Sequence, residues 1–159
     1  MHETPRLLVV DDEHAIAELL SRHLETEGYR VSLAFDAEEA LQSLDKARFH
    51  LVITDIRMPG RDGLSLLEVA RKNDPTLPVI VLTSVSDVDT AVKAMRLGAQ
   101  DYIVKPFNLE ALSIAVERAL DRRHLLLSAQ RHQEELELAV EEKTRKLRLA
   151  LSEVQGTFN

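Results

Sequence analysis

The sequence predicts an α/β protein in which a five-stranded parallel sheet is covered by helices on both faces, followed by an extended C-terminal helix. Short apolar runs alternate with longer amphipathic segments over residues 1–107, which is typical of a doubly wound sheet. Most of these runs are continuously apolar, as expected for strands buried on both faces, and the run at residues 31–34 is the weaker one. Residues 107–155 contain neither proline nor glycine, which predicts one helix of about 49 residues.

The five predicted strands are short, and each is followed by a segment long enough for a helix. We infer the flavodoxin-like strand order 2-1-3-4-5 from the fold class, because hydrophobic periodicity does not specify which strands are neighbours. The predicted strands are residues 7–10, 31–34, 51–54, 79–83 and 102–104.

Helix signals lie between these strands. Gly28 is expected to end the first helix, and Asp36 with Glu39 has the spacing of a capping box at the start of the second. The third helix is expected to stop before Pro75 and the fourth to lie within residues 86–98. Apolar residues at helical spacing are Ile16, Leu19, Leu20 and Leu24 in the first helix, Leu64, Leu67 and Ala70 in the third, and Val88, Val92 and Met95 in the fourth.

Composition limits the function classes. The net charge is −7, and residues 1–120 hold 20 acidic but only 13 basic side chains, so direct nucleic-acid binding is not favoured. The chain has no cysteine, which excludes disulfides and thiolate chemistry. No apolar run reaches membrane-spanning length. We expect a cytoplasmic protein with a globular domain at residues 1–122 and a helical extension at 123–159.

Polar residues follow four of the predicted strands. Asp11 and Asp12 come just after the first strand, and Asp55 comes just after the third. Thr83 ends the fourth strand, and Lys105 follows the fifth. Because ligands of doubly wound sheets bind at the carboxyl ends of the strands, we expect these five side chains to form one site.

Three carboxylates without a neighbouring histidine or cysteine cluster suit a hard divalent cation, which points to Mg²⁺ or Mn²⁺. A strand-end aspartate such as Asp55 can act as a nucleophile and form an aspartyl phosphate. The metal would neutralise charge on the incoming phosphoryl group, and the ammonium of Lys105 would pair with carboxylate or phosphate. The alternative is that Asp11 and Asp12 only cap a helix that starts near Glu13.

The segments VVDDE, TDIRMPGRDGL, VIVLTS and GAQDYIVKPF together resemble the receiver domain of bacterial two-component response regulators. The resemblance covers roughly residues 5–122 and implies that Asp55 is the phosphoacceptor. It also implies that Asp12 and Asp55 bind Mg²⁺ directly, that Asp11 binds it through water, and that the Arg57 backbone carbonyl is a further ligand.

The resemblance extends to the switch of such a domain. It implies that Thr83 is the switch hydroxyl, that Lys105 pairs with the phosphoryl group, and that the Tyr102 ring reorients together with Thr83. The phosphoryl group would come from a sensor histidine kinase or a small phosphodonor, in a two-component phosphorelay. Beyond catalysing its own phosphorylation and dephosphorylation, the domain is not expected to be an enzyme.

The C-terminal extension carries a heptad pattern from Leu126 onward. We expect it to form a parallel two-helix coiled coil that dimerises the chain, the alternative being a solvated single helix. It resembles the linkers that join receivers to HD-GYP, diguanylate cyclase or histidine kinase output domains. The heptad positions are Leu126, Gln133, Val140, Leu147 and Val154 at a, and Ala129, Leu136, Lys143 and Ala150 at d.

Two other functions remain open from the residues. A haloacid-dehalogenase-type phosphatase also uses a strand-end aspartate with Mg²⁺, but it places an acidic residue where this chain has Arg57. A pseudo-receiver that serves as a constitutive coiled-coil dimerisation scaffold would share the fold but not the phosphorylation.

Overall fold

The computed structural model describes residues 3–157. The chain divides into two units, residues 1–123 and residues 124–159. None of the helices within the described residues has an apolar stretch long enough to cross a membrane.

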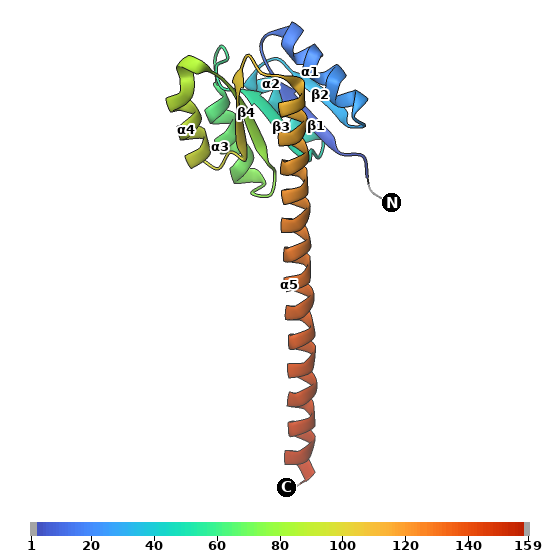
Figure 1. Cartoon of the computed structure of the whole chain (residues 1–159). Coiled ribbons are helices and arrows are strands. Elements are labelled where there is room, and N and C mark those ends of the chain that lie inside the picture. The colour runs from blue at the N-terminus through green and yellow to red at the C-terminus, as the bar shows by residue number, and fades with distance from the viewer. Residues whose placement is uncertain (1–2, 158–159) are drawn as a thin grey trace. The chain divides into compact units, whose positions relative to one another are not determined.

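The first unit contains one five-stranded sheet, whose strands all run parallel in the order β2-β1-β3-β4-β5 (Figure 1). This confirms the predicted fold class and strand order. Three strands end one residue later than predicted, so that Asp55 and Lys105 are the last residues of β3 and β5 and do not follow them, and Ser84 instead of Thr83 ends β4. The strands are β1 (Arg6–Val10), β2 (Arg30–Ala34), β3 (Leu51–Asp55), β4 (Val79–Ser84) and β5 (Asp101–Lys105).

Helices alternate with the strands, as predicted. One short 3₁₀ turn, η1 (Val85–Asp87), separates β4 from the following helix, which therefore begins two residues after Ser86. The helices are α1 (His14–Thr26), α2 (Ala37–Lys46), α3 (Gly63–Asn73), α4 (Val88–Arg96) and α5 (Leu109–Thr157).

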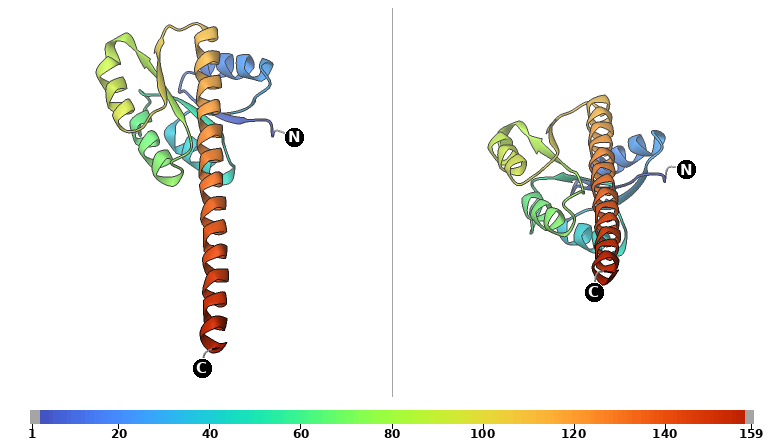
Figure 2. Two further views of the ribbon diagram at one scale, coloured as in Figure 1. Left: turned by 60° about the horizontal axis from the view of Figure 1, so that its bottom comes forward. Right: turned by 90° about the horizontal axis from the view of Figure 1, so that it is seen from below.

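Each face of the sheet has its own hydrophobic core, because successive strand residues point to opposite faces. Leu8 and Val52 point into the core that α2, α3 and α4 cover. Leu7 and Ile53 point into the core that α1 and the first part of α5 cover, and Figure 2 shows helices on both faces of the sheet. The central strands β1, β3 and β4 are thus buried on both sides, which explains their continuous apolar sequences, whereas the edge strands β2 and β5 are only partly buried.

The predicted helix-start signal at Asp36 is confirmed. Its carboxylate accepts a hydrogen bond from the Glu39 backbone N–H at 2.8 Å. The Glu39 carboxylate in turn accepts from the Phe35 backbone N–H at 2.6 Å, one residue earlier than in the usual capping box. Asp62 caps α3 in the same way, accepting from the Ser65 backbone N–H at 2.9 Å. Both caps satisfy backbone donors that the first helical turn leaves unpaired.

The predicted face of α1 is confirmed for Leu20 and Leu24, which are fully buried, and for Ile16, which packs against the same core. It is wrong for Leu19, which is 53% exposed.

The predicted face of α4 is wrong. In α4 the exposed residues are Val88, Val92 and Met95, and the buried ones are Ala91 and Ala94. Alanine at these positions lets the helix backbone approach the sheet closely, so the larger side chains lie at the flanks of the contact.

The second unit is the remainder of α5 up to Thr157. Most of the apolar side chains that the structure describes in this unit are exposed within the single chain, both at predicted seam positions such as Leu136 and Val140 and outside the seam, as at Leu138 and Leu149. The predicted helix is confirmed, whereas the predicted coiled coil remains a prediction.

Gly63 is the tightest backbone position near the end of β3. A Cβ atom added there would lie 2.2 Å from the backbone oxygen of Asp55, and a backbone carbonyl cannot rotate away as a side chain can. Gly63→Ala should therefore lower the free energy of unfolding by about 3 kcal/mol, measured by urea denaturation.

Gly60→Ala is the matched control in the same loop. A Cβ at Gly60 meets nothing within 4 Å, but its φ of 80° is unfavourable for alanine, so we expect a loss of about 1 kcal/mol. Equal losses for the two variants would contradict the assignment of a steric clash at Gly63.

Candidate functional site

The three predicted carboxylates meet at the carboxyl edge of the sheet. Asp11 and Asp12 follow β1, and Asp55 ends β3, which is the neighbour of β1 in the sheet. One oxygen from each carboxylate lies within 4.8 Å of the others. Asp11 is fully buried and Asp55 is nearly so, so water alone cannot screen their mutual repulsion.

Lys105 supplies the positive charge of this cluster. Its Nζ donates to Asp11 Oδ2 at 3.0 Å and to Asp55 Oδ2 at 3.1 Å. Burial opposes the charge of the ammonium, but the hydrogen bond and charge of Asp11, together with those of Asp55, outweigh it and raise the pKa of Lys105. The peptide bond from Lys105 to Pro106 is cis.

The charged form of the Asp55 carboxylate remains disfavoured despite the nearby ammonium of Lys105. Burial raises the pKa of its carboxyl group, the charge of Lys105 lowers it, and the charge of Asp11 raises it again, with a net increase. Three carboxylates against one ammonium leave a local charge of about −2 when all are ionised. A divalent cation with oxygen ligands fits this donor set and would remove the imbalance.

Helix capping explains only part of the acidic pair. Asp11 Oδ1 accepts from the Glu13 backbone N–H at 3.0 Å, which orders the chain just before α1. The N-cap of α1 is Glu13, and it makes no side-chain cap hydrogen bond. Within residues 3–157, the structure shows no backbone N–H that donates to the Asp12 carboxylate and would give it a capping role. Capping therefore leaves Asp12 unexplained.

Thr83 and Tyr102 do not engage the carboxylates in this structure. The Thr83 hydroxyl lies near two backbone carbonyls, 3.2 Å from Ser84 O and 3.3 Å from Asp87 O. The Tyr102 side chain on β5 is 43% exposed. Both residues lie on the strands β4 and β5 beside the site. Because neither side chain contacts the carboxylates here, their switch roles remain predictions.

Arg57 contacts the site through its backbone. Its N–H donates to Asp55 Oδ1 at 3.3 Å, while the role of its carbonyl as a metal ligand remains a prediction. Its side chain does something that the sequence analysis missed: Nε donates to Asp87 Oδ2 at 2.8 Å and Nη2 to Asp87 Oδ1 at 2.6 Å. The guanidinium thereby holds the pKa of Asp87 below its usual range.

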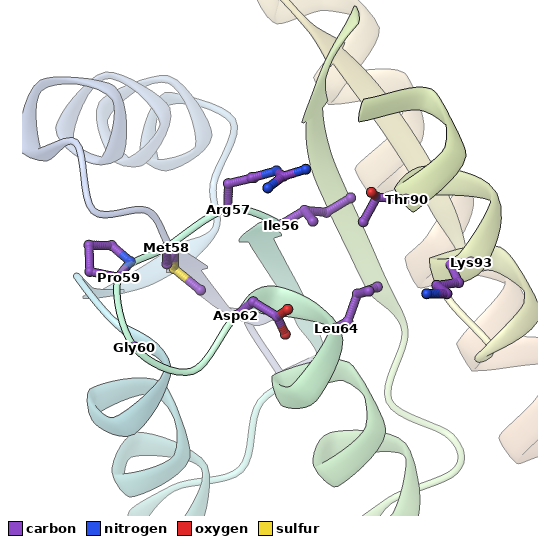
Figure 3. Close-up of a pocket in the computed structure, with 9 residues that line it drawn as sticks. All are labelled: Ile56, Arg57, Met58, Pro59, Gly60, Asp62, Leu64, Thr90 and Lys93. Atoms are coloured by element: carbon purple, nitrogen blue, oxygen red, sulfur yellow. The ribbon is translucent and has the colours of Figure 1, made fainter. Parts of the chain in front are cut away.

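A cavity of about 640 Å³ lies beside this ion pair. The loop after β3 lines one side of it, including Arg57 and Asp62, and α4 lines the other with Thr90 and Lys93 (Figure 3). The cavity is adjacent to the carboxylate site but does not include the three aspartates.

The sequence profile described as "Response regulator receiver domain" matches residues 7–117. The chain belongs to this family. The match covers the sheet, the carboxylate site and the first part of α5. The receiver domain of this chain therefore carries the residues predicted for it at the carboxyl edge of its sheet.

Relatives of known name are regulatory proteins. The receiver is 37% identical over 123 residues to "Transcriptional regulatory protein ZraR" of Escherichia coli strain K12, covering 77% of this chain and 28% of that protein. It is 42% identical over 120 residues to "Transcriptional regulatory protein PrrA" of Mycobacterium leprae, covering 76% and 52%. The chain thus spans about a quarter to a half of the length of these relatives.

Solved structures show the same fold. A response regulator receiver domain protein from Clostridium thermocellum superposes with a TM-score of 0.74 at 36% identity, covering 77% of this chain and 98% of that one. NtrX from Brucella abortus, in complex with ADP, superposes with a TM-score of 0.77 at 38% identity, covering 80% and 30%.

If the three carboxylates bind a divalent cation, Mg²⁺ should stabilise the receiver. At ten times the dissociation constant, binding contributes about 1.4 kcal/mol, which raises Tm by about 3–6 °C for a domain of this size. Asp12→Asn should reduce this Mg²⁺-dependent shift, because it removes one anionic ligand. Thermal unfolding monitored by circular dichroism with and without Mg²⁺ measures both effects.

Asp62→Asn is the control for this experiment. Asp62 lies in the neighbouring loop and caps α3, and asparagine caps a helix about as well as aspartate. Its Mg²⁺-dependent shift should equal that of the wild type. An unchanged shift in Asp12→Asn would rule out the proposed ligand.

Proposed function

We propose that this chain is a phosphorylation-switched receiver in which Asp55 accepts a phosphoryl group in a Mg²⁺-dependent reaction. The observation that supports this most directly is the two-way hydrogen bonding of Lys105, which joins Asp11 to Asp55 beside Asp12. Two buried carboxylates that share one lysine, with a third, more accessible carboxylate beside them, stabilise a fold less well than apolar side chains of similar volume would. This arrangement does serve a reaction that transfers an anion onto a carboxylate.

The transfer uses residues that the structure brings together. A carboxylate oxygen of Asp55 attacks the phosphorus atom of the donor, the bond from phosphorus to the leaving group breaks, and an acyl phosphate forms. Lys105 Nζ donates a hydrogen bond to Asp55 Oδ2 at 3.1 Å, so this ammonium is close enough to pair with the phosphoryl oxygens. A bound Mg²⁺ would supply positive charge to the same oxygens.

The phosphoryl group would act as a switch through Thr83 and Tyr102. Its oxygens give the Thr83 hydroxyl a stronger acceptor than the backbone carbonyls that it contacts here. Movement of Thr83 would leave space for the exposed Tyr102 ring to turn inward. Such differential contacts are what a two-state switch requires.

A partner histidine kinase or a small phosphodonor would supply the phosphoryl group, and the chain would catalyse only its own phosphorylation and dephosphorylation. Relatives are named as transcriptional regulators, so a transcriptional output in a longer protein has support from the comparisons. The expectation of an HD-GYP, diguanylate cyclase or kinase output has no support from those names and remains a prediction.

The second unit would join two copies of the chain as a parallel coiled coil. Exposed apolar residues at the heptad positions, including Leu136 and Val140, support this. The chain could instead be a constitutive dimerisation scaffold without phosphorylation, but the intact set of Asp55, Lys105 and Thr83 argues against that alternative.

Incubation with acetyl phosphate and Mg²⁺ should add one phosphoryl group to the protein, detected by intact mass spectrometry. Asp55→Asn should take none, and neither should the wild type when Mg²⁺ is removed with a chelator. No adduct on the wild type under any condition would favour the constitutive scaffold.

The coiled-coil seam can be tested with two leucines that are two positions apart. Leu136→Glu places a charge at a d position and should raise the dimer dissociation constant at least about tenfold, measured by sedimentation equilibrium. Leu138→Glu makes the same change outside the seam and should leave the constant nearly unchanged. Equal effects of the two variants, or a monomeric wild type, would contradict the proposed seam.

A further inference from the structure

The ion pair between Arg57 and Asp87 joins the two loops beside the carboxylate site. Arg57 belongs to the loop between β3 and α3, and Asp87 ends η1, which leads from β4 into α4. The guanidinium donates to both carboxylate oxygens, at 2.8 and 2.6 Å. A two-point contact of this kind fixes orientation as well as distance.

Asp87 also holds the residues at the end of β4. Its backbone carbonyl lies 3.3 Å from the Thr83 hydroxyl, which donates to it, and its carboxylate accepts from Ser84 Oγ at 3.4 Å. Asp87 is only 9% exposed, so these contacts lie largely out of water. Asp87 therefore accepts hydrogen bonds both from the Arg57 guanidinium and from the Thr83 hydroxyl.

Arg57 reaches the phosphoacceptor at its other end. Its backbone N–H donates to Asp55 Oδ1 at 3.3 Å. A continuous series of contacts thus runs from Asp55 through Arg57 and Asp87 to Thr83. A change at the Asp55 carboxylate alters its hydrogen bond with the Arg57 backbone N–H. A movement of Thr83 breaks the hydrogen bond from its hydroxyl to the Asp87 carbonyl.

We propose that Arg57 and Asp87 are positioning residues for Thr83. Their ion pair holds the turn between β4 and α4 in the arrangement in which the Thr83 hydroxyl is bonded to Ser84 O and Asp87 O. The pair thereby opposes the engagement of Thr83 with a phosphoryl group on Asp55. This inference rests on the proposed function, since it concerns the switch of the same site.

The cavity of about 640 Å³ lies beside α4, the helix into which the turn leads. It separates the loop that carries Arg57 from Thr90 and Lys93 of α4 (Figure 3). Fewer packed side chains oppose a shift of α4 on this side than in a close-packed interior. Arg57 itself lines this cavity, and its ion pair with Asp87 is a directional contact between the two loops.

The test measures the initial rate of phosphorylation of the full chain by acetyl phosphate with Mg²⁺. Arg57→Ala and Asp87→Asn should each raise this rate by about two- to fivefold, the range expected when one partly exposed ion pair stops favouring one of two states. The double variant should show the same rate as either single variant, because both substitutions remove the same interaction.

Two further variants separate positioning from a direct effect of the Arg57 charge on the reaction. In a Thr83→Ala background, Arg57→Ala should no longer change the rate, because the hydroxyl that the pair positions is gone. Arg57→Lys keeps the charge without the two-point contact, so its rate should lie between those of the wild type and Arg57→Ala.

Arg61→Ala is the matched control. Arg61 lies in the same loop and pairs with Glu38 at 3.3 Å, away from Asp87, so its loss should leave the phosphorylation rate unchanged. An Arg57→Ala effect that persists in the Asp87→Asn or Thr83→Ala background would overturn the proposal, as would unchanged rates in both single variants.

Nuclear magnetic resonance of the unphosphorylated proteins tests the positioning role of Arg57 and Asp87 without relying on phosphorylation of Asp55. The amide resonances of Thr83 and Ser84 should shift to the same new positions in Arg57→Ala and Asp87→Asn, and they should stay in place in Arg61→Ala. Resonances that do not shift would overturn the positioning role. This holds even if the wild-type chain accepts no phosphoryl group, a result that would count against the proposed function alone.

Discussion

The balance of charge at the carboxyl edge of the sheet is the constraint around which the site is organised. Two buried carboxylates, Asp11 and Asp55, share the ammonium of Lys105, and Asp12 adds a third negative charge within reach. One lysine is enough to hold the carboxylates together but not to neutralise them. The site is therefore stable enough to be preformed and still anionic enough to take up a cation.

The fold makes this arrangement possible because all five strands run in the same direction. Residues at the ends of β1, β3, β4 and β5 then emerge at one edge, although they are separated by long stretches of sequence. Both faces of the sheet are covered by helices, so the backbone beneath the site is rigid. Gly63 extends this constraint into the loop after β3, where only a hydrogen side chain fits against the Asp55 carbonyl.

The loops above this rigid base have the contacts that a switch needs. Thr83 is held by carbonyls of its own turn, and that turn is tied through Asp87 to the loop of Arg57. These contacts are few, partly exposed and located beside a cavity, whereas the central strands of the sheet are almost fully buried. Rearrangement is therefore easiest in the loops, and the loop of Arg57 contacts the Asp55 carboxylate directly.

The sequence alone was sufficient for the strand pattern, the strand order inferred from the fold class, and the convergence of Asp11, Asp12, Asp55 and Lys105. These depend on local periodicity and on the rule that parallel strands end at one edge. Tertiary structure decided which face of a helix is buried, because close approach to the sheet favours Ala91 and Ala94 over the larger Val88 and Val92. It also decided the pairing of Arg57 with Asp87, since no periodic pattern relates two side chains that are 30 residues apart and meet only when their loops fold side by side.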